Sequence, residues 1–261
     1  MRHKFAAQLY TLRNEIRKDF PGVLRELKKM GYVAVQIDGL YDYPADEIAD
    51  VLKETGLKTA GMHISLDRMN NELETVLKEA DLFGTTDFFC HYLEEEMQNI
   101  EGYLKAKHDL LEVAKKVTPR GYRVGYHHHD FEFRTQIDGK FALDYILEKE
   151  DGLSLYPEVD TYWVKMAGID PLSYMKKFPN RIPILHLKDM TNDERKYFAE
   201  VGTGTIDFQP ILLWGEQNGV EFYAVEQDFC PGSPFDSLEL SLTNLIKLSE
   251  KSMRIETYKR W

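Results

Sequence analysis

The chain has 261 residues and a formal net charge of −11, with 43% hydrophobic and 30% charged residues. This balance is typical of a soluble globular protein, and it argues against a nucleic-acid or anionic-membrane binder, because both surfaces attract positive charge. The two cysteines make no disulfide framework, no apolar run is long enough to span a membrane, and the first residues do not resemble a signal peptide. We therefore expect a cytoplasmic protein with no membrane partner.

Short apolar segments alternate with amphipathic segments along the whole chain. Apolar runs rich in β-branched and aromatic residues predict strands, and apolar residues at helical spacing that end at glycine predict helices. The predicted strands cover residues 4–10, 32–38, 57–65, 86–92, 122–129, 153–160, 181–189 and 221–228. The predicted helices cover residues 19–31, 44–56, 70–84, 97–117, 142–148, 170–179, 207–219 and 235–250.

This alternation predicts an α/β fold. Eight strand–helix units within this length are typical of a (β/α)8 TIM barrel, and we expect one such domain over residues 1–261. A doubly wound open sheet is the competing architecture, but it usually needs fewer units.

Polar residues suited to catalysis fall where the predicted strands end. In a (β/α)8 barrel the active site forms at the carboxyl ends of the strands. In chain order these ends carry His63, His91, the cluster at residues 127–132, Asp160, His186 and Glu226. Alternation along a strand places Glu158 on the same face as Asp160. It likewise places Lys188 on the face of His186.

These strand ends predict a divalent metal site. A single buried carboxylate can be structural, paired with a lysine or capping a helix, but four successive strands with such ends are harder to explain without a cation. Carboxylates together with imidazole suit one divalent ion, with manganese, magnesium or cobalt favoured and zinc as a further candidate.

The order of motifs resembles the sugar-phosphate isomerase/epimerase branch of the xylose isomerase-like barrels. The motifs are QLYTLR, YHHHDFEF, EVDTYWV, HLKD, VGTGTIDF and AVEQD, and they cover nearly the whole chain. The resemblance implies one divalent metal bound by Glu, Asp, His and Glu from strands five to eight. The last three match Asp160, His186 and Glu226. For the first place we expect Glu132, with His127 as the alternative ligand and Glu132 then paired with Arg134.

Other residues in these motifs suggest substrate contacts. Alternation points His127 and His129 inward, and Trp163 stands where related keto-sugar epimerases have a histidine, so it is expected to form an apolar wall. His63 and His91 are expected at the pocket, either touching substrate or as satisfied outer groups. The glycines of VGTGT suggest either a phosphate cradle or, more simply, a tight turn.

The expected function is that of a metal-dependent isomerase or epimerase. It would act on a sugar, keto sugar or sugar phosphate by removing a proton next to a carbonyl. Glu226 or Glu158 would take the proton, and Lys188 would polarise a substrate oxygen or bind an anionic group. The alternative is an inosose-type dehydratase or a 3-keto-glycoside lyase, because both begin with the same proton abstraction.

Two further classes fit less well. Apurinic endonucleases share the barrel, but they need more metal ligands, including a histidine where Trp163 stands, and the acidic charge opposes a duplex. A non-catalytic sugar-binding barrel would not need this ligand set. The expected partner is thus a small carbohydrate rather than nucleic acid, and a homo-oligomer is compatible with the sequence.

Overall fold

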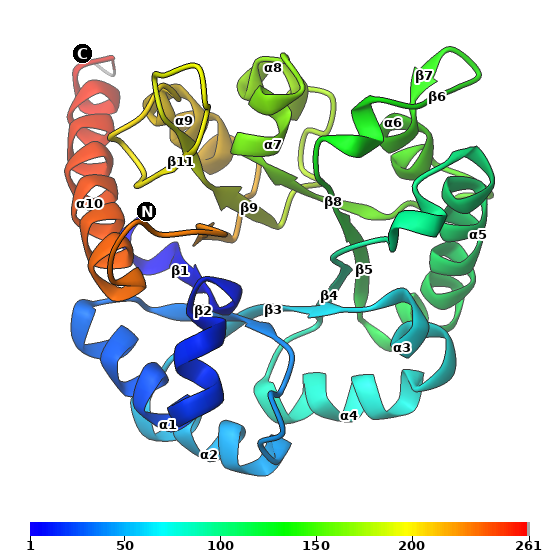
Figure 1. Cartoon of the computed structure of the whole chain (residues 1–261), viewed down its shortest axis with the longest axis horizontal. Coiled ribbons are helices and arrows are strands. Elements are labelled where there is room, and N and C mark those ends of the chain that lie inside the picture. The colour runs from blue at the N-terminus through cyan, green and yellow to red at the C-terminus, as the bar shows by residue number, and fades with distance from the viewer. Residues whose placement is uncertain (260–261) are drawn as a thin grey trace.

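The structure, a computed structural model, describes the backbone of residues 1–259 and the side chains of residues 1–251. Within that range eight parallel strands close a barrel in the order β1-β12-β9-β8-β5-β4-β3-β2, as Figure 1 shows. The strands are β1 Phe5–Gln8, β2 Ala34–Asp38, β3 Lys58–Ile64, β4 Asp87–Cys90, β5 Arg123–His127, β8 Tyr156–Asp160, β9 Ile184–Leu187 and β12 Phe222–Val225. The predicted (β/α)8 barrel is confirmed.

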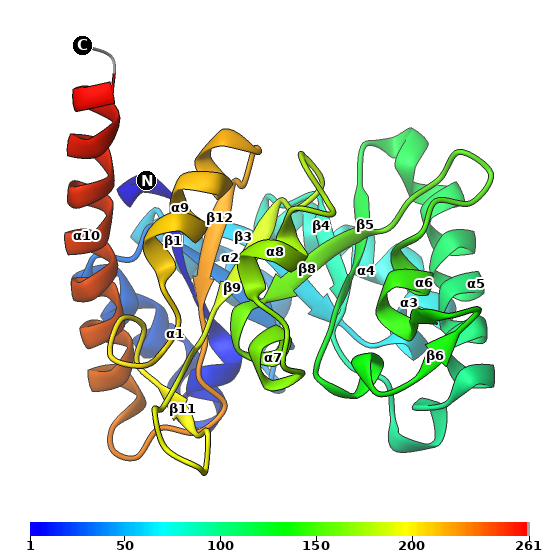
Figure 2. The same cartoon turned by 90° about the horizontal axis from the view of Figure 1, so that it is seen from above.

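Helices cover the outside of the barrel. They are α1 Arg13–Met30, α2 Ala45–Thr55, α3 Leu66–Asn71, α4 Leu73–Phe83, α5 Ile100–Val117, α6 Ala142–Leu147, α7 Thr161–Met166, α8 Pro171–Met175, α9 Phe208–Gln217 and α10 Pro234–Lys259. In Figure 2, α10 stands along the side of the barrel next to α9. No helix in the described part of the chain is long and apolar enough to cross a membrane.

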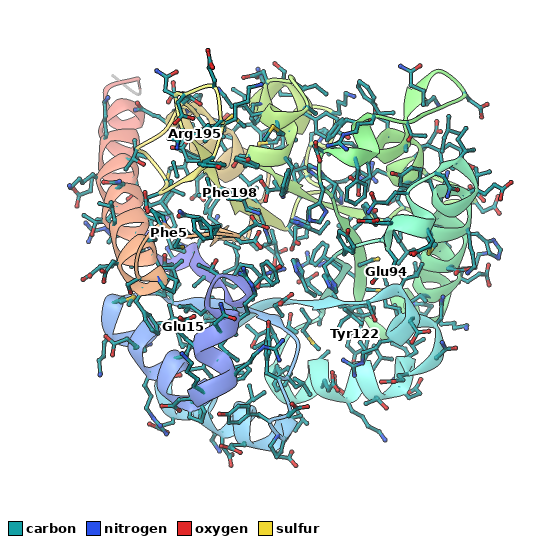
Figure 3. All side chains as sticks on the ribbon, viewed as in Figure 1. Phe5, Glu15, Glu94, Tyr122, Arg195 and Phe198 are labelled. Carbon is teal, nitrogen blue, oxygen red and sulfur yellow. The ribbon has the colours of Figure 1, made fainter. Side chains whose placement is uncertain are left out.

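Two short hairpins extend the loops at the strand ends. They are β6 Gln136–Ile137 with β7 Lys140–Phe141, and β10 Asp189–Met190 with β11 Phe198–Ala199. The ring of Phe198 packs against Tyr162, with centroids 4.5 Å apart. Figure 3 shows Phe198 toward the middle of the barrel. The second hairpin therefore covers part of the site end.

The helices differ from prediction at three places, each with a local cause. The helix predicted over 19–31 starts earlier, at Arg13, and Asp19 leaves helical geometry where its carboxylate accepts from the amide of Gly22. The helix predicted over 70–84 is two helices, because Glu72 adopts a non-helical conformation between them. Helix α7 was not predicted, and Asp160 begins it by accepting hydrogen bonds from two backbone amides.

The barrel interior changes from apolar to polar along the strand direction. Near the amino ends an inner cluster combines small and bulky apolar residues, namely Ala6, Ala34, Ala60, Phe89, Ile184 and Ala224. Because side chains alternate, the next inward positions lie two residues further along each strand. The buried side chains there are Gln8, Gln36, His127, Glu158, His186 and Glu226, and they are joined by His63, which lies three residues after Ala60 because the register between β2 and β3 shifts. The small residues below leave room for this polar layer.

Gly125 on β5 illustrates how tightly the interior is packed. A Cβ atom added there would lie 2.2 Å from a ring carbon of Phe89 and 2.4 Å from the carbonyl oxygen of Tyr156. Gly125→Ala should therefore lower the free energy of unfolding by about 1–3 kcal/mol or more, measured by urea denaturation. Gly232→Ala is the matched control, because nothing lies within 4 Å of its Cβ position. Equal stabilities of the two variants would contradict this packing.

Candidate metal centre and pocket

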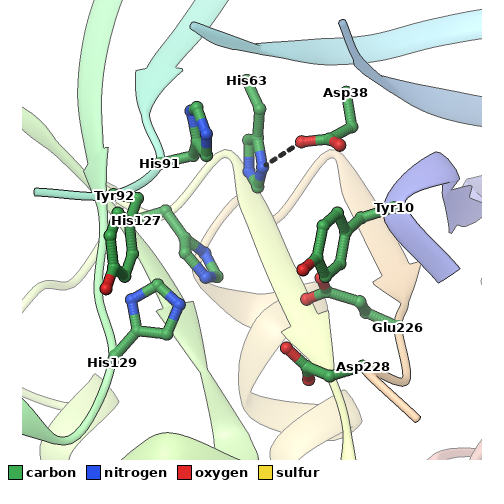
Figure 4. A pocket seen from close by; sticks show the side chains of 9 residues that line it. All are labelled: Tyr10, Asp38, His63, His91, Tyr92, His127, His129, Glu226 and Asp228. Atoms are coloured by element: carbon green, nitrogen blue, oxygen red, sulfur yellow. Dashed lines mark ion pairs between the residues drawn. The ribbon is translucent and has the colours of Figure 1, made fainter. Parts of the chain in front are cut away.

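A pocket of about 460 Å³ opens at the carboxyl end of the barrel. Its walls are Tyr10, Asp38, His63, His91, Tyr92, His127, His129, Glu226 and Asp228. Figure 4 shows the imidazoles of His91, His127 and His129 on one side and the carboxylates of Glu226 and Asp228 on the other. Imidazole nitrogen atoms and carboxylate oxygen atoms thus lie on opposite sides of the pocket.

Below the pocket, Glu158 lies at the centre of a fully buried polar layer. Its Oε2 is 2.6 Å from His63 Nε2 and 3.2 Å from His186 Nε2. His127 Nδ1 also lies 3.1 Å from this oxygen. Burial alone would raise the pKa of Glu158, but His186 and His63 outweigh burial and hold it well below its usual range. Glu158 is therefore a carboxylate with its charge already matched.

His186 presents its two ring nitrogens to different groups. Nε2 lies 2.7 Å from Gln36 Oε1, and Nδ1 lies 2.9 Å from Glu226 Oε2. Burial would lower the pKa of His186, but Glu158 and Glu226 outweigh it and raise the pKa to about 10. The ring therefore bridges the inner polar layer and the pocket floor.

Lys188 lies beneath the same floor among three carboxylates. Its Nζ is 2.6 Å from Asp228 Oδ2, 3.0 Å from Glu226 Oε2 and 3.2 Å from Asp160 Oδ2. These acids raise the pKa of Lys188 well above its usual value although burial would lower it. One ammonium therefore faces three carboxylates, and the ring of His186 approaches one of them, Glu226, from the other side.

Neutral imidazoles line the opposite wall. Burial lowers the pKa of His91, and it lowers the pKa of His129 well below the usual range. The Nδ1 atom of each ring has no hydrogen-bond partner among the described residues. Both rings are therefore neutral groups in the wall of the pocket.

Within residues 1–251, two groups of side chains bring potential ligand atoms within 4.8 Å of one another. One is His63, His127, Glu158 and His186, and the other is His127, Asp160, His186 and Glu226. In the first group Glu158 is already hydrogen-bonded by His63 and Gln36. In the second, Asp160 Oδ2 is buried and, apart from its ion pair with Lys188 at 3.2 Å, makes no hydrogen bond among the described residues. Two imidazoles with two carboxylates and such an atom fit a divalent ion.

Glu132, which was expected in the first place of the ligand set, lies outside both groups of potential ligand residues. Its two oxygens accept hydrogen bonds from Tyr126 Oη at 2.8 Å and the backbone amide of His129 at 2.9 Å. Arg134 pairs with Asp130, so the predicted pair with Glu132 is also absent. Glu132 therefore holds the loop after β5, and His127, the alternative ligand, belongs to both groups of potential ligand residues.

Several other predicted site residues lie where the sequence suggested. His63, His91, His127 and His129 all line the pocket. Trp163 lies one layer behind it, with its ring 5.2 Å from that of His129. Glu158 and Lys188 lie under the floor, with exposed fractions of 0% and 1%, so neither is open to the pocket. Their predicted direct contact with substrate therefore has no support in the geometry.

The VGTGT segment wraps a carboxylate of the chain itself. The backbone amides of Gly202 and Gly204 donate to Asp189 Oδ2 at 3.0 Å and 2.9 Å, and Ile206 donates to Oδ1. The amides considered for a phosphate cradle are therefore taken. The VGTGT segment therefore forms a tight turn, which was the simpler of the two interpretations of its glycines.

Some site residues were not singled out from the sequence. Gln36 and Asp38 close the second strand at inward positions, and their alternation with apolar neighbours is a signal that could have revealed them. His128 is directed away from the pocket and its Nε2 accepts from the backbone amide of Asp160 at 3.1 Å. His128 thus ties β5 to the strand end that carries Asp160, a role that only the fold reveals.

Among curated proteins, the chain is similar to two enzymes named inosose dehydratase. It is 23% identical over 276 residues to that of Geobacillus kaustophilus, covering 84% of this chain and 87% of the relative. It is 25% identical over 206 residues to that of Clostridium beijerinckii, covering 72% of this chain and 63% of the relative. No family model matches the chain.

Solved structures share the fold at low sequence identity. A sugar phosphate isomerase/epimerase from Parabacteroides distasonis has a TM-score of 0.77 at 21% identity, covering 93% of both chains. The IOLI protein with a bound zinc atom has a TM-score of 0.73 at 15% sequence identity, covering 95% of this chain and 99% of the other. The probable 3-DHS dehydratase AsbF of Bacillus anthracis has a TM-score of 0.68 at 13% sequence identity, covering 93% of this chain and 98% of the other. The xylose isomerase-like barrel that the motifs predicted is confirmed as the fold.

The burial of Glu132 predicts how stability depends on pH. Burial raises its pKa from 4.5 to about 7. Between these values the unfolded chain releases the proton that the folded chain keeps, so the free energy of unfolding falls as pH rises, by up to roughly 3 kcal/mol. Glu132→Gln stays neutral and should lose this contribution. Urea unfolding of both chelator-treated proteins from pH 4.5 to 7.5 measures the difference, and parallel stability profiles would contradict the assignment.

Proposed function

We propose that the protein is a metal-dependent dehydratase of an uncharged polyhydroxy ketone. The donor set of His127, Asp160, His186 and Glu226 below a pocket with acids and imidazoles on opposite walls carries this proposal. The relatives named inosose dehydratase favour loss of water over the isomerase or epimerase reaction expected first. A 3-keto-glycoside lyase would use the same proton abstraction and remains the nearest variant.

A bound divalent ion would supply Lewis-acid chemistry by drawing electrons from the substrate carbonyl. His127, Asp160, His186 and Glu226 would hold it, with His127 in the place first expected for Glu132. The zinc atom bound by the structurally similar IOLI protein supports a metal in this fold. The mixed nitrogen and oxygen donors suit manganese, cobalt or zinc, and suit magnesium less.

Glu226 is placed to take the proton next to the carbonyl. It lines the pocket, and although burial would raise its pKa, Lys188 and His186 hold it well below its usual range. It is therefore ionised and open to substrate, whereas Glu158, the other base considered, is shielded by His63 and Gln36. Glu226 thus accepts the proton and Glu158 does not.

The opposite wall can assist the departing hydroxyl group. His91 and His129 line this wall, and Tyr10 and Tyr92 frame the same space. Glu226 removes the proton from carbon, the β-hydroxyl leaves with that proton as water while the wall hydrogen-bonds the departing oxygen, and the enol product relaxes to a ketone. Lys188 keeps Asp228 and Glu226 in place by its charge.

The pocket walls favour an uncharged substrate. Among the residues that line it no lysine or arginine occurs, while Asp38, Glu226 and Asp228 are acidic. The glycine-rich turn that a phosphate would need is occupied by Asp189. The hydroxyl groups of such a substrate can donate hydrogen bonds to the acids, and its ring can stack against Tyr10 or Tyr92. The acids would repel a phosphate group.

Metal content tests the donor set. His186→Ala, Asp160→Ala and His127→Ala should each lose most of the bound manganese, cobalt or zinc, because each removes one of four ligands. Glu132→Gln should retain one ion per chain. Elemental analysis after dialysis against each metal measures this. Full occupancy in His127→Ala together with loss in Glu132→Gln would reverse the assignment of the first ligand.

Turnover of a substrate panel tests the reaction. The metal-loaded protein, incubated in deuterated water with inosose, 3-keto sugars and ketose phosphates, should exchange the proton beside the carbonyl and release water only from uncharged members. Glu226→Gln should lower both rates by at least about 10²-fold, since it removes a base and a metal ligand together. NMR follows both events. Exchange without loss of water would return the isomerase or epimerase to first place.

A further inference from the structure

Gln36 connects Glu158 to His186 through a chain of buried hydrogen bonds. Gln36 Nε2 donates to Glu158 Oε1, and Gln36 Oε1 faces His186 Nε2 at 2.7 Å. Gln8 Nε2 donates to the same Gln36 oxygen at 3.0 Å. All four side chains are 0% exposed, so water cannot substitute for a missing partner.

The direction of these hydrogen bonds is set by Glu158. An ionised carboxylate only accepts hydrogen bonds, so the amide of Gln36 must direct its NH2 group to Glu158 and its oxygen to the other side. That oxygen can only accept, and therefore Nε2 of His186 must carry a proton. Nδ1 faces the carboxylates of Glu226 and Asp160, so a divalent ion would take the place of the proton on Nδ1 while Nε2 keeps its own.

We propose that Glu158 and Gln36 are positioning residues that set the orientation and proton position of the metal ligand His186. This inference rests on the proposed metal centre and gives Glu158 a different role from the base that the sequence suggested. Metal-bound histidines commonly donate their second ring N–H to an acceptor that fixes the ring, and losing that acceptor costs about 10–100-fold in metal affinity.

The same chain reaches the pocket wall through His63. Its Nε2 donates to Glu158 at 2.6 Å, and its Nδ1 lies 3.5 Å from Asp38, which lines the pocket. Figure 4 shows this pair of His63 and Asp38 at the pocket edge. A substrate that contacts Asp38 on β2 would therefore be connected, through His63 and Glu158, to the hydrogen bonds that hold His186 on β9.

Cobalt affinity in a set of matched variants tests the proposal. Glu158→Gln allows the amide of Gln36 to reverse, so cobalt should bind about 10–100-fold more weakly. The exchanged pair Gln36→Glu with Glu158→Gln again offers His186 Nε2 an acceptor and should recover most of the affinity. Glu79→Gln is the control. Glu79 is a buried carboxylate on the outer helix α4, and it is paired with Arg68 on α3 rather than with the metal site. Competition with a coloured chelator measures each affinity.

A second measurement does not depend on metal. In ¹⁵N-histidine NMR of the metal-free protein, the Nε2–H signal of His186 should be protected from solvent exchange in the wild type and in the exchanged pair. It should lose protection in Glu158→Gln and in Gln36→Leu. If wild type binds no cobalt but shows this pattern, the proposed metal centre fails, and the result supports only that Glu158 and Gln36 orient the ring of His186.

Two results would overturn the positioning role. One is wild-type cobalt affinity in Glu158→Gln with an unchanged His186 signal. The other is a loss in Glu158→Gln that the exchanged pair does not recover, because that loss would reflect charge or packing rather than hydrogen-bond direction. Thermal unfolding of each variant identifies any that fail to fold.

Discussion

The barrel has to bury acidic side chains at its carboxyl end, and the rest of the site follows from how their charge is balanced. Glu158, Asp160 and Glu226 are at most 5% exposed. A buried carboxylate is costly unless a partner or hydrogen bonds compensate it. Lys188 and the ring of His186 supply part of this compensation from inside. The charge that they leave unbalanced is what makes the floor suited to a divalent ion.

The acidic residues of this end divide into those that organise the structure and those that remain free for a ligand. Glu132 holds the loop after β5, and Asp189 holds the glycine-rich turn after β9. Glu158 is engaged in the inner layer. Only Asp38, Glu226 and Asp228 among the described acids line the pocket. This division explains why a list of acids near strand ends overestimates the number that can touch substrate.

Several proteins of different chemistry share this fold with the chain, so the fold alone does not select the reaction. The similar structures include a sugar phosphate isomerase/epimerase and a probable dehydratase. The chemistry of this chain has to be inferred from its own side chains at the strand ends, such as His127 on β5, Trp163 behind the wall, and the Gln36–Glu158 pair below the floor. Function in such barrels depends on these grafted groups.

The sequence by itself determined the order of strands and helices, the barrel, and the inward positions of Asp160, His186 and Glu226, because alternation and helical spacing are local patterns. It also identified His127 as an alternative ligand. It could not decide between His127 and Glu132, since the difference lies in which groups reach the carboxylate: Tyr126 and the His129 amide close around Glu132 only once the loop is folded. The shielding of Glu158 on β8 likewise requires Gln36 on β2 and His63 on β3, and only closure of the barrel brings β8 to face these strands, neither of which is its neighbour, across the interior.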